Sequence, residues 1–183
     1  MTTRPKAPTA PSPRIRAAVA LFAPRPGERL LEIGCGTGQG IEVALAAAPG
    51  ATVAAIDRSE TAVARARVVN AVAIAAGRAS VAVGDIERGP VTPGLGGPGA
   101  AGGFDRAYAV RVNSFWTRPG PALRHAVESL RPDGELWLIY DGPADKVIGP
   151  ILASFRDFGL AGIRTESAHG AFALVAARPT SAG

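Results

Sequence analysis

Three glycines at alternate positions, Gly34, Gly36 and Gly38, stand between an apolar segment and a stretch with helical character. Glycine allows a tight turn and lets a ligand lie against bare backbone, as in the loops that follow ligand-binding strands. A nicotinamide-binding loop would read G-x-G-x-x-G, but the sixth position is Gln39 counted from Gly34 and Ile41 counted from Gly36. The loop therefore fits a ligand-binding turn but neither register of a dinucleotide site.

Two aspartates follow the next two apolar segments, where parallel strands would end. Asp57 comes directly after residues 52–56, and Asp85 comes after residues 80–83 and one glycine. A carboxylate there can accept two hydrogen bonds from a vicinal diol, each charge-assisted and worth about 1.5–3 kcal/mol. Asp57 suits such a diol, and its alternative role is to cap a helix that begins near Ser59. Asp85 either accepts from a ring amine or ends its strand in solvent.

Strands and helices must alternate to position these residues. The pattern predicts strands at 29–33, 52–56, 80–83, 104–110, 135–140, 163–167 and 172–177. It predicts helices at 14–22, 40–48, 59–76, 121–130 and 145–158. Such alternation indicates βαβ units and a parallel sheet covered on both faces. The last two strands are separated by only four residues, Ala168 to Ala171, so we expect the final strand to run antiparallel.

The segment Glu32-Ile33-Gly34-Cys35-Gly36-Thr37-Gly38 resembles the E/D-x-G-x-G-x-G loop of the class I S-adenosylmethionine-dependent methyltransferases. The turn Leu130-Arg131-Pro132-Asp133-Gly134-Glu135-Leu136 is similar to the L-[RK]-P-G-G-x-L turn of that family, with Asp133 in place of a glycine. The similarity extends from about residue 14 to 178. It implies a methyltransferase with an α/β fold, a Rossmann-like doubly wound seven-stranded sheet in the order 3-2-1-4-5-7-6 with strand 7 antiparallel.

The resemblance also implies S-adenosylmethionine as the cofactor. Asp57 takes the position of the family's ribose-binding carboxylate, Asp85 that of the acidic residue beside adenine, and Glu32 that of the residue that orients the methionine end. For Glu32 the alternative is a simply buried, hydrogen-bonded carboxylate. Cys35 is interpreted as a small residue that packs beside the ligand, because no histidine is near it in the sequence. The predicted cofactor-binding residues are Glu32, Gly34, Cys35, Gly36, Gly38, Asp57, Arg58, Asp85, Ile86, Ala109 and Val110.

Methyl transfer from a sulfonium is an in-line displacement in which charge is lost, so alignment of the acceptor matters more than a general base. The catalytic residue stays open, and the acceptor-side candidates are Asn113, Trp116, Tyr140, Asp141 and His169. Trp116 either forms a wall for the acceptor or packs a helix, and His169 either faces the acceptor or is an ordinary turn residue. His125 is interpreted as a surface residue. Amide-nitrogen and adenine methyltransferases usually carry N/D-P-P-Y/F/W after the fourth strand, and this chain does not, which counts against nucleic-acid amino methylation.

Length and composition indicate one domain. The chain has 183 residues, of which 47% are hydrophobic and 19% charged. Residues 1–13 contain four prolines and predict a disordered tail, residues 14–183 a single methyltransferase domain, and residues 89–103, with seven glycines and three prolines, a flexible loop. A single cysteine excludes a disulfide framework, which predicts a reducing, cytoplasmic compartment. The two histidines lie too far apart in the sequence to suggest a metal site. No apolar run approaches the roughly 18 residues of a membrane span, so we expect no membrane partner.

The net charge of +5 lies entirely in residues 1–31, which contain six basic residues and one acidic residue, Glu28. The rest of the chain has almost no inserted lid, which favours a small-molecule acceptor. One alternative is a nucleic-acid-directed methyltransferase or binder that uses the basic tail as a tether, which is possible but not favoured. The other is a catalytically silent protein that binds the cofactor. The oligomeric state is not predicted.

Overall fold

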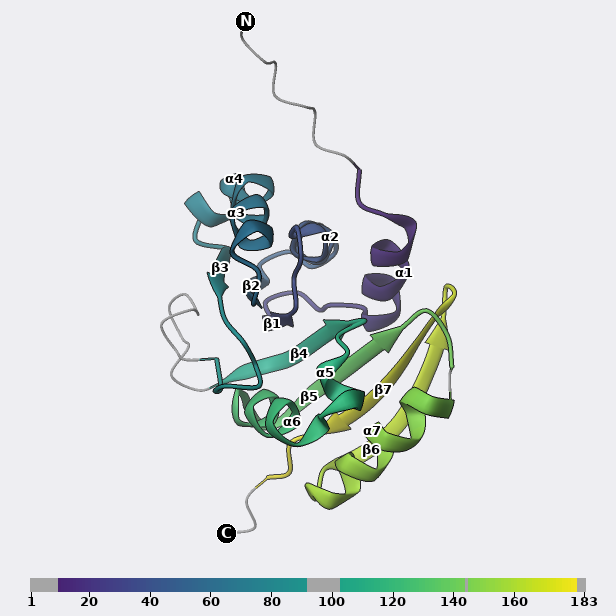
Figure 1. Ribbon diagram of the computed structural model, residues 1–183. Helices are drawn as coiled ribbons and strands as arrows, with labels where there is room; N and C mark the ends of the chain where they lie inside the picture. The colour runs from purple at the N-terminus through teal and green to yellow at the C-terminus, as the bar shows by residue number, and fades with distance from the viewer. Residues whose placement is uncertain (1–9, 92–102, 144, 181–183) are drawn as a thin grey trace, which may run out of the picture.

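A computed structural model describes residues 10–91, 103–143 and 145–180 of the chain (Figure 1). In these residues one seven-stranded sheet has the order β3-β2-β1-β4-β5-β7-β6. Its strands are β1 (Arg29–Ile33), β2 (Thr52–Asp57), β3 (Ala79–Val83), β4 (Phe104–Val110), β5 (Leu130–Tyr140), β6 (Ala161–Ala168) and β7 (Ala171–Ala177). Neighbours from β3 to β5 pair in parallel, whereas β7 is antiparallel to both β5 and β6. The predicted strand order and the antiparallel strand 7 are confirmed.

Helices cover both faces of this sheet (Figure 1). One face carries α1 (Pro13–Phe22), α2 (Gln39–Ala47), α3 (Glu60–Val69) and α4 (Ala71–Ala75), and the other carries α5 (Ser114–Thr117), α6 (Pro119–Glu128) and α7 (Asp145–Asp157). The helix predicted over 59–76 is therefore two helices, which meet at Asn70. The short helix α5 has no counterpart in the sequence prediction.

Alternation along the strands separates two hydrophobic cores. Leu31 and Ile33 of β1 pack with the helices α5 to α7, whereas Leu30 packs with α1, α2 and α3. All three side chains are buried, and each contributes about 1.5–3 kcal/mol on leaving water. Strands buried on both faces explain why the sequence shows continuous apolar runs rather than alternation.

Helix α1 begins at Pro13, with Ser12 as its N-cap. The Ser12 Oγ accepts a hydrogen bond from the Ile15 N–H at 3.4 Å, and the Ser12 N–H donates to Gln39 Oε1 on α2 at 3.1 Å. These contacts fix the start of α1 against α2. Residues 1–9 of the predicted tail and residues 92–102 of the predicted loop 89–103 lie outside the described residues.

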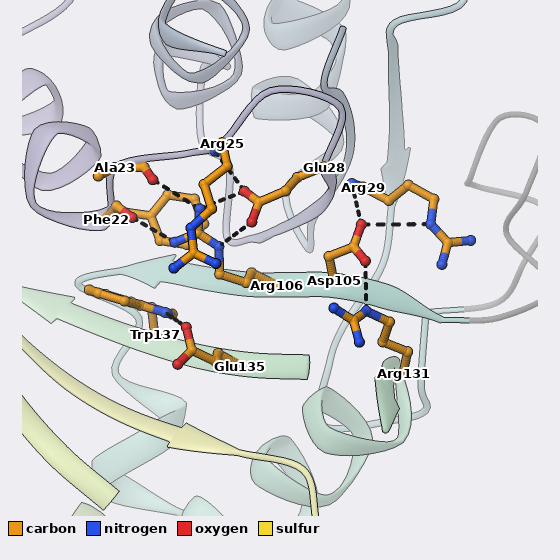
Figure 2. A network of polar contacts seen from close by, with 10 residues as sticks. All are labelled: Phe22, Ala23, Arg25, Glu28, Arg29, Asp105, Arg106, Arg131, Glu135 and Trp137. Atoms are coloured by element: carbon orange, nitrogen blue, oxygen red, sulfur yellow. Dashed lines mark hydrogen bonds and ion pairs between the residues drawn. The ribbon is translucent and has the colours of Figure 1, made fainter. Parts of the chain in front are cut away.

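A buried arginine joins the other end of α1 to the sheet (Figure 2). Arg106 of β4 is 3% exposed and contacts the Glu28 carboxylate through Nε at 3.0 Å and Nη2 at 2.5 Å. It also donates to the carbonyls of Phe22 at 2.7 Å and Ala23 at 2.9 Å, and its guanidinium lies 4.1 Å from the centre of the Phe22 ring. Such a bidentate pair with added carbonyl acceptors satisfies the buried charge and fixes α1 over the sheet.

Candidate functional site

The glycine loop joins β1 to α2 in a backbone conformation that only glycine adopts without strain. Gly34, Gly36 and Gly38 have φ angles of +75°, +52° and +84°. A Cβ added at Gly34 would lie 2.6 Å from the Val112 side chain, and one at Gly38 would lie 2.5 Å from the Asn70 amide nitrogen. At Gly36 a Cβ would meet nothing within 4 Å. Packing therefore requires the outer two glycines, and a ligand can approach the backbone at Gly36.

The loop N–H groups donate to acceptors within the protein. The N–H groups of Gly34 and Cys35 both donate to the Ile56 carbonyl, at 2.8 and 3.0 Å, and the Gly38 N–H donates to the Cys35 carbonyl at 2.9 Å. Loops that bind phosphate instead direct free N–H groups at the ligand. These three N–H groups are therefore not free to bind phosphate, which agrees with the absence of the dinucleotide spacing.

Asp57 lies at the carboxyl end of β2 and faces the glycine loop. Its Oδ2 accepts from the Gly36 N–H at 2.8 Å, and its Oδ1 accepts from the Ser59 N–H at 2.9 Å. The N-cap of α3 is Ser59, whose Oγ accepts from the Ala62 N–H at 3.3 Å. Asp57 is therefore not that helix cap. Because each carboxylate oxygen can accept more than one hydrogen bond, Asp57 keeps the capacity to bind a ligand.

The carboxyl ends of β1, β2, β3 and β4 surround a cavity of about 380 Å³. The predicted cofactor-binding residues that line it are Gly34, Asp57, Arg58, Asp85, Ile86 and Val110. The predicted residues that do not line it are Glu32, Cys35, Gly36, Gly38 and Ala109. Sheets of this kind bind ligands outside the carboxyl ends of their strands, where the strand order reverses. Here that reversal lies between β1 and β4.

Asp85 follows β3 and contributes to its own turn. Its Oδ1 accepts from the Glu87 N–H at 3.0 Å, and its Oδ2 lies 3.7 Å from Nε of Arg88. Helix α6 also helps to fix this turn. The half-buried His125 lies with its Nδ1 at 2.7 Å from the Ile86 carbonyl oxygen, which accepts a hydrogen bond from the ring N–H. The interpretation of His125 as a surface residue is therefore wrong, since its ring helps to position one wall of the cavity.

Other residues that line the first cavity were not predicted. Glu87 accepts from the Ser114 hydroxyl at 2.6 Å and lies 3.2 Å from Nη2 of Arg118. Ser114 and Arg118 begin and follow α5, a helix of four residues that gives no periodic signal in the sequence. Trp116, also on α5, is half-buried and packs against the adjacent core instead of lining this cavity.

Glu32 and Cys35 are buried at the base of the loop. Burial raises the pKa of Glu32 to about 8; the nearby Tyr108 hydroxyl lowers it and the negative charge of Asp57 raises it. A Cβ at Gly40 would collide with the Glu32 carboxylate, so Gly40 leaves the space that this side chain occupies. Burial also raises the pKa of Cys35 to about 12, and the charges of Glu32 and Asp57 add smaller increases. Cys35 is therefore a neutral thiol near pH 7 and not an activated nucleophile.

A second cavity, of about 340 Å³, lies between α1, the ends of β4 and β5, and the turn from β6 to β7. Three acceptor-side candidates, Tyr140, Asp141 and His169, line this cavity, whereas Asn113 lines the first. Val110 lines both cavities, so they adjoin at the end of β4. Tyr140 donates its hydroxyl to the Val112 carbonyl at 3.2 Å, and burial raises the pKa of Tyr140 above its usual range.

The fold is that of the methyltransferase family, and the sequence agrees. Residues 31–136, more than half of the chain, match the family model described as "Methyltransferase domain". The chain therefore belongs to this family, the class I S-adenosylmethionine-dependent methyltransferases. It is 38% identical over 128 residues to the nocamycin O-methyltransferase of Saccharothrix syringae. That match covers 69% of this chain but 42% of the relative, so the chain spans less than half of the relative's length.

Solved structures share the fold at low sequence identity. An S-adenosylmethionine-dependent O-methyltransferase from Thermotoga maritima matches with a TM-score of 0.68 and 15% identity, over 99% of this chain and 70% of that chain. The [4+2]-cyclase SpnF matches with a TM-score of 0.70 and 18% identity, over 92% of this chain and 82% of that chain. Likeness at these identities shows the fold alone, and the cyclase illustrates that one fold carries different reactions.

Two further features bear on partners and metals. Within residues 10–91, 103–143 and 145–180, no helix has the length and apolar character needed to cross a membrane. The same residues contain no group of three or more histidine, cysteine, aspartate or glutamate side chains arranged to hold a metal ion.

Proposed function

We propose that this methyltransferase binds S-adenosylmethionine in the first cavity and methylates a small molecule in the second. The observation that carries the proposal is the position of Asp57. Its carboxylate lines the first cavity and is held by the Gly36 N–H at the one loop glycine with open space beside it. A fixed carboxylate beside an exposed backbone turn is suited to a vicinal diol.

The residues of the first cavity fit this cofactor. Asp57 offers acceptors to the ribose hydroxyls, and Asp85 offers an acceptor to the adenine amine. Ile86 and Val110 give apolar surface for the adenine ring. The N–H groups of Gly34, Cys35, Gly36 and Gly38 are already bonded, which suits a cofactor without phosphate. When bound, the cofactor supplies an activated methyl group on a sulfonium, and the protein aligns the acceptor and excludes water.

The second cavity supports a small acceptor. It adjoins the first at Val110, and its volume of about 340 Å³ is within the usual range for small-molecule sites. The relative from Saccharothrix syringae is named for O-methylation of nocamycin, which supports an acceptor of this size class. Of the groups that line the cavity, Tyr140 stays protonated because burial raises its pKa, so it can orient an acceptor but does not act as a base near pH 7.

Titration with S-adenosylhomocysteine tests the cofactor site. Asp57→Ala removes two charge-assisted acceptors, which we expect to weaken binding by about 2–4 kcal/mol, or roughly 30- to 1000-fold. The matched control is Asp157→Ala, at an exposed position on α7, which should leave the affinity unchanged. Because Asp57 also accepts from Gly36 and Ser59, thermal melts without ligand will report any loss of structure.

Two results would overturn the assignment. If Asp57→Ala binds as tightly as the wild type, Asp57 does not hold the ribose. If the wild type shows no binding at millimolar S-adenosylhomocysteine, the cofactor proposal fails. Incubation with labelled S-adenosylmethionine and separate pools of small metabolites and of RNA, at low and high salt, tests the acceptor class. Label in the small-molecule pool at both salt concentrations is expected, and label in RNA that disappears at high salt would favour the nucleic-acid alternative.

A further inference from the structure

One carboxylate at the edge of the second cavity is shared by two arginines. Arg14 Nε lies 3.1 Å from Asp141 Oδ1, and Arg111 Nε lies 3.4 Å from Asp141 Oδ2. The three side chains come from α1 and from the ends of β4 and β5. Two guanidinium groups and one carboxylate leave a net charge of +1 in this group.

The backbone at Arg111 is strained. Its φ angle is +59°, a left-handed conformation that disfavours side chains larger than glycine, and its N–H donates to the Ile139 carbonyl at 2.9 Å. Such strain persists where the surrounding structure enforces it, and it gathers at functional sites. Arg111 lines the first cavity while its partner Asp141 lines the second, so the strained residue stands where the two cavities adjoin.

The second cavity has apolar walls behind this charged edge. Its lining includes Ala17 and Ala18 of α1 and the apolar residues Val110, Ile139 and Ala171 of the sheet. A ligand that fills this cavity is therefore expected to carry an apolar body. A negative charge on such a ligand has guanidinium partners at the edge of the cavity, where Arg14 lines it and Arg111 lines the adjoining first cavity.

We propose that Arg14 and Arg111 recognise a carboxylate on the acceptor, whose apolar body occupies the second cavity. This inference rests on the proposed function, because it takes the second cavity as the acceptor site. Asp141 acts as a replaceable counter-ion. Its side chain is 47% exposed and those of Arg14 and Arg111 are 55% and 51% exposed, and exposed ion pairs of this kind are weak. Guanidinium groups match the planar geometry of a carboxylate, and an acceptor that brings its own carboxylate can displace Asp141.

Paired probes of the same shape test the charge requirement. Titrations of 2-naphthoate and its neutral analogue 2-naphthamide are made in saturating S-adenosylhomocysteine and without it. We expect 2-naphthoate to bind at least about tenfold more tightly, as for one charge-assisted contact that is partly screened by solvent. Shifts of the backbone amide signals of Ala17 and Ala171 in nuclear magnetic resonance spectra would place the probe in the second cavity.

Variants separate the roles of the three charged residues. Arg14→Gln and Arg111→Gln should each reduce the preference for 2-naphthoate by about threefold or more, whereas Asp141→Asn should increase it because both arginines lose their counter-ion. Arg156→Gln, at an exposed position on α7, is the matched control and should change nothing. Arg14 lies on the exposed side of α1, so its variant keeps the test valid if the strained Arg111 position does not tolerate substitution.

Three outcomes would overturn the inference. Equal affinity for the two probes would show that the ligand needs no charge. A preference that persists in both arginine variants would show that Arg14 and Arg111 do not recognise the carboxylate. The third outcome is that the arginine variants weaken the binding of S-adenosylhomocysteine but not that of 5′-methylthioadenosine, and leave the preference for 2-naphthoate intact. In that case the arginines hold the amino-acid carboxylate of the cofactor. Failure of S-adenosylhomocysteine to bind the wild type would instead overturn the proposed function, so the two failures are distinguishable.

Discussion

Glu32 of β1 and Tyr108 of β4 are register partners on adjacent parallel strands, and both side chains are buried. The Tyr108 hydroxyl lies close enough to the Glu32 carboxyl to lower its pKa, but neither Glu32 Oε2 nor this hydroxyl forms a hydrogen bond of good geometry within the part of the chain that the structure describes. Burial raises the pKa of both groups, so both stay neutral near pH 7. A buried polar pair with poor hydrogen-bond geometry costs stability, and the raised pKa of Glu32 makes that cost depend on pH.

The free energy of unfolding should fall as pH rises from about 5 to 8. The Glu32 pKa is near 4.5 in the unfolded chain and about 8 in the folded protein, so between these values the unfolded state loses the proton first. The folded state is then disfavoured by up to about 1.4 kcal/mol per pH unit, and the loss levels off above pH 8. Glu32→Gln should remove this slope and raise the stability at pH 8. Urea unfolding of both proteins at several pH values measures it.

Asp157→Asn, at an exposed position on α7, is the control for loss of one carboxylate and should keep the slope of the wild type. Equal slopes in the wild type and Glu32→Gln would show that Glu32 ionises in the folded protein with an ordinary pKa.

Asn70 connects the glycine loop to the end of α3. Its amide Nδ2 donates to the Gly38 carbonyl at 2.9 Å and to the Ala66 carbonyl at 3.0 Å, and the residue is 4% exposed. Asn70→Ala should lower the free energy of unfolding by about 1–3 kcal/mol, because the Gly38 carbonyl loses a buried partner. The loop should also loosen, so S-adenosylhomocysteine should bind several-fold more weakly.

Ser154→Ala on α7 provides the comparison for Asn70→Ala. The Ser154 hydroxyl donates to the Pro150 carbonyl at 2.9 Å within its own helix, so its loss should lower stability without changing ligand affinity. Equal effects of the two variants on affinity would mean that Asn70 acts on stability alone.

The ion pair of Arg106 and Glu28 should show strong coupling (Figure 2). Arg106→Met leaves the Glu28 carboxylate with only the Arg25 N–H and removes the donor from two carbonyls, and Glu28→Gln leaves the buried guanidinium poorly compensated. We expect Arg106→Met to lower the free energy of unfolding by about 3–5 kcal/mol. The double variant should lower it by less than the sum of the two single variants. Unfolding in urea gives all three values. Additive effects would show that the two charges do not interact.

The strand order was implied by the resemblance to the methyltransferase family, whereas the cavity at the strand ends could be predicted because its signals are local. An apolar run ends, and a glycine loop or an aspartate follows at once, as at Gly34, Asp57 and Asp85. In a parallel sheet these ends meet along one edge, so local signals are sufficient to assemble the cavity. Whether these residues bind the cofactor stays a prediction.

Long-range contacts could not be predicted. Asn70 interrupts an otherwise helical sequence because its amide bonds to Gly38, 32 residues away. His125 looks like a surface residue until β3 brings Ile86 to its ring. The shared carboxylate of Asp141 likewise depends on how α1 lies over β4 and β5. Each is set by tertiary structure, for which one sequence holds no periodic signal.

The irregular segment near the start of β5, where the pairing with β4 shifts register between Leu130 and Glu135, offers a last test of local strain. Asp133 has a φ angle of +60°, a region where glycine avoids the cost of a side chain, and its N–H donates to the Arg178 carbonyl at 2.9 Å. Asp133→Gly should raise the free energy of unfolding by about 0.5–1 kcal/mol, since relief of strain exceeds the added freedom of the unfolded chain.

The neighbouring Gly134 gives the opposite result, because a Cβ there would lie 2.9 Å from the carbonyl oxygens of Arg131 and Phe104. Gly134→Ala should therefore destabilise the protein by roughly 1–3 kcal/mol. Thermal and urea unfolding of the two variants measure both effects, and the affinity for S-adenosylhomocysteine should stay constant, since neither residue lines a described cavity. A loss of stability in Asp133→Gly would mean that the aspartate side chain stabilises the turn by more than its strained backbone costs.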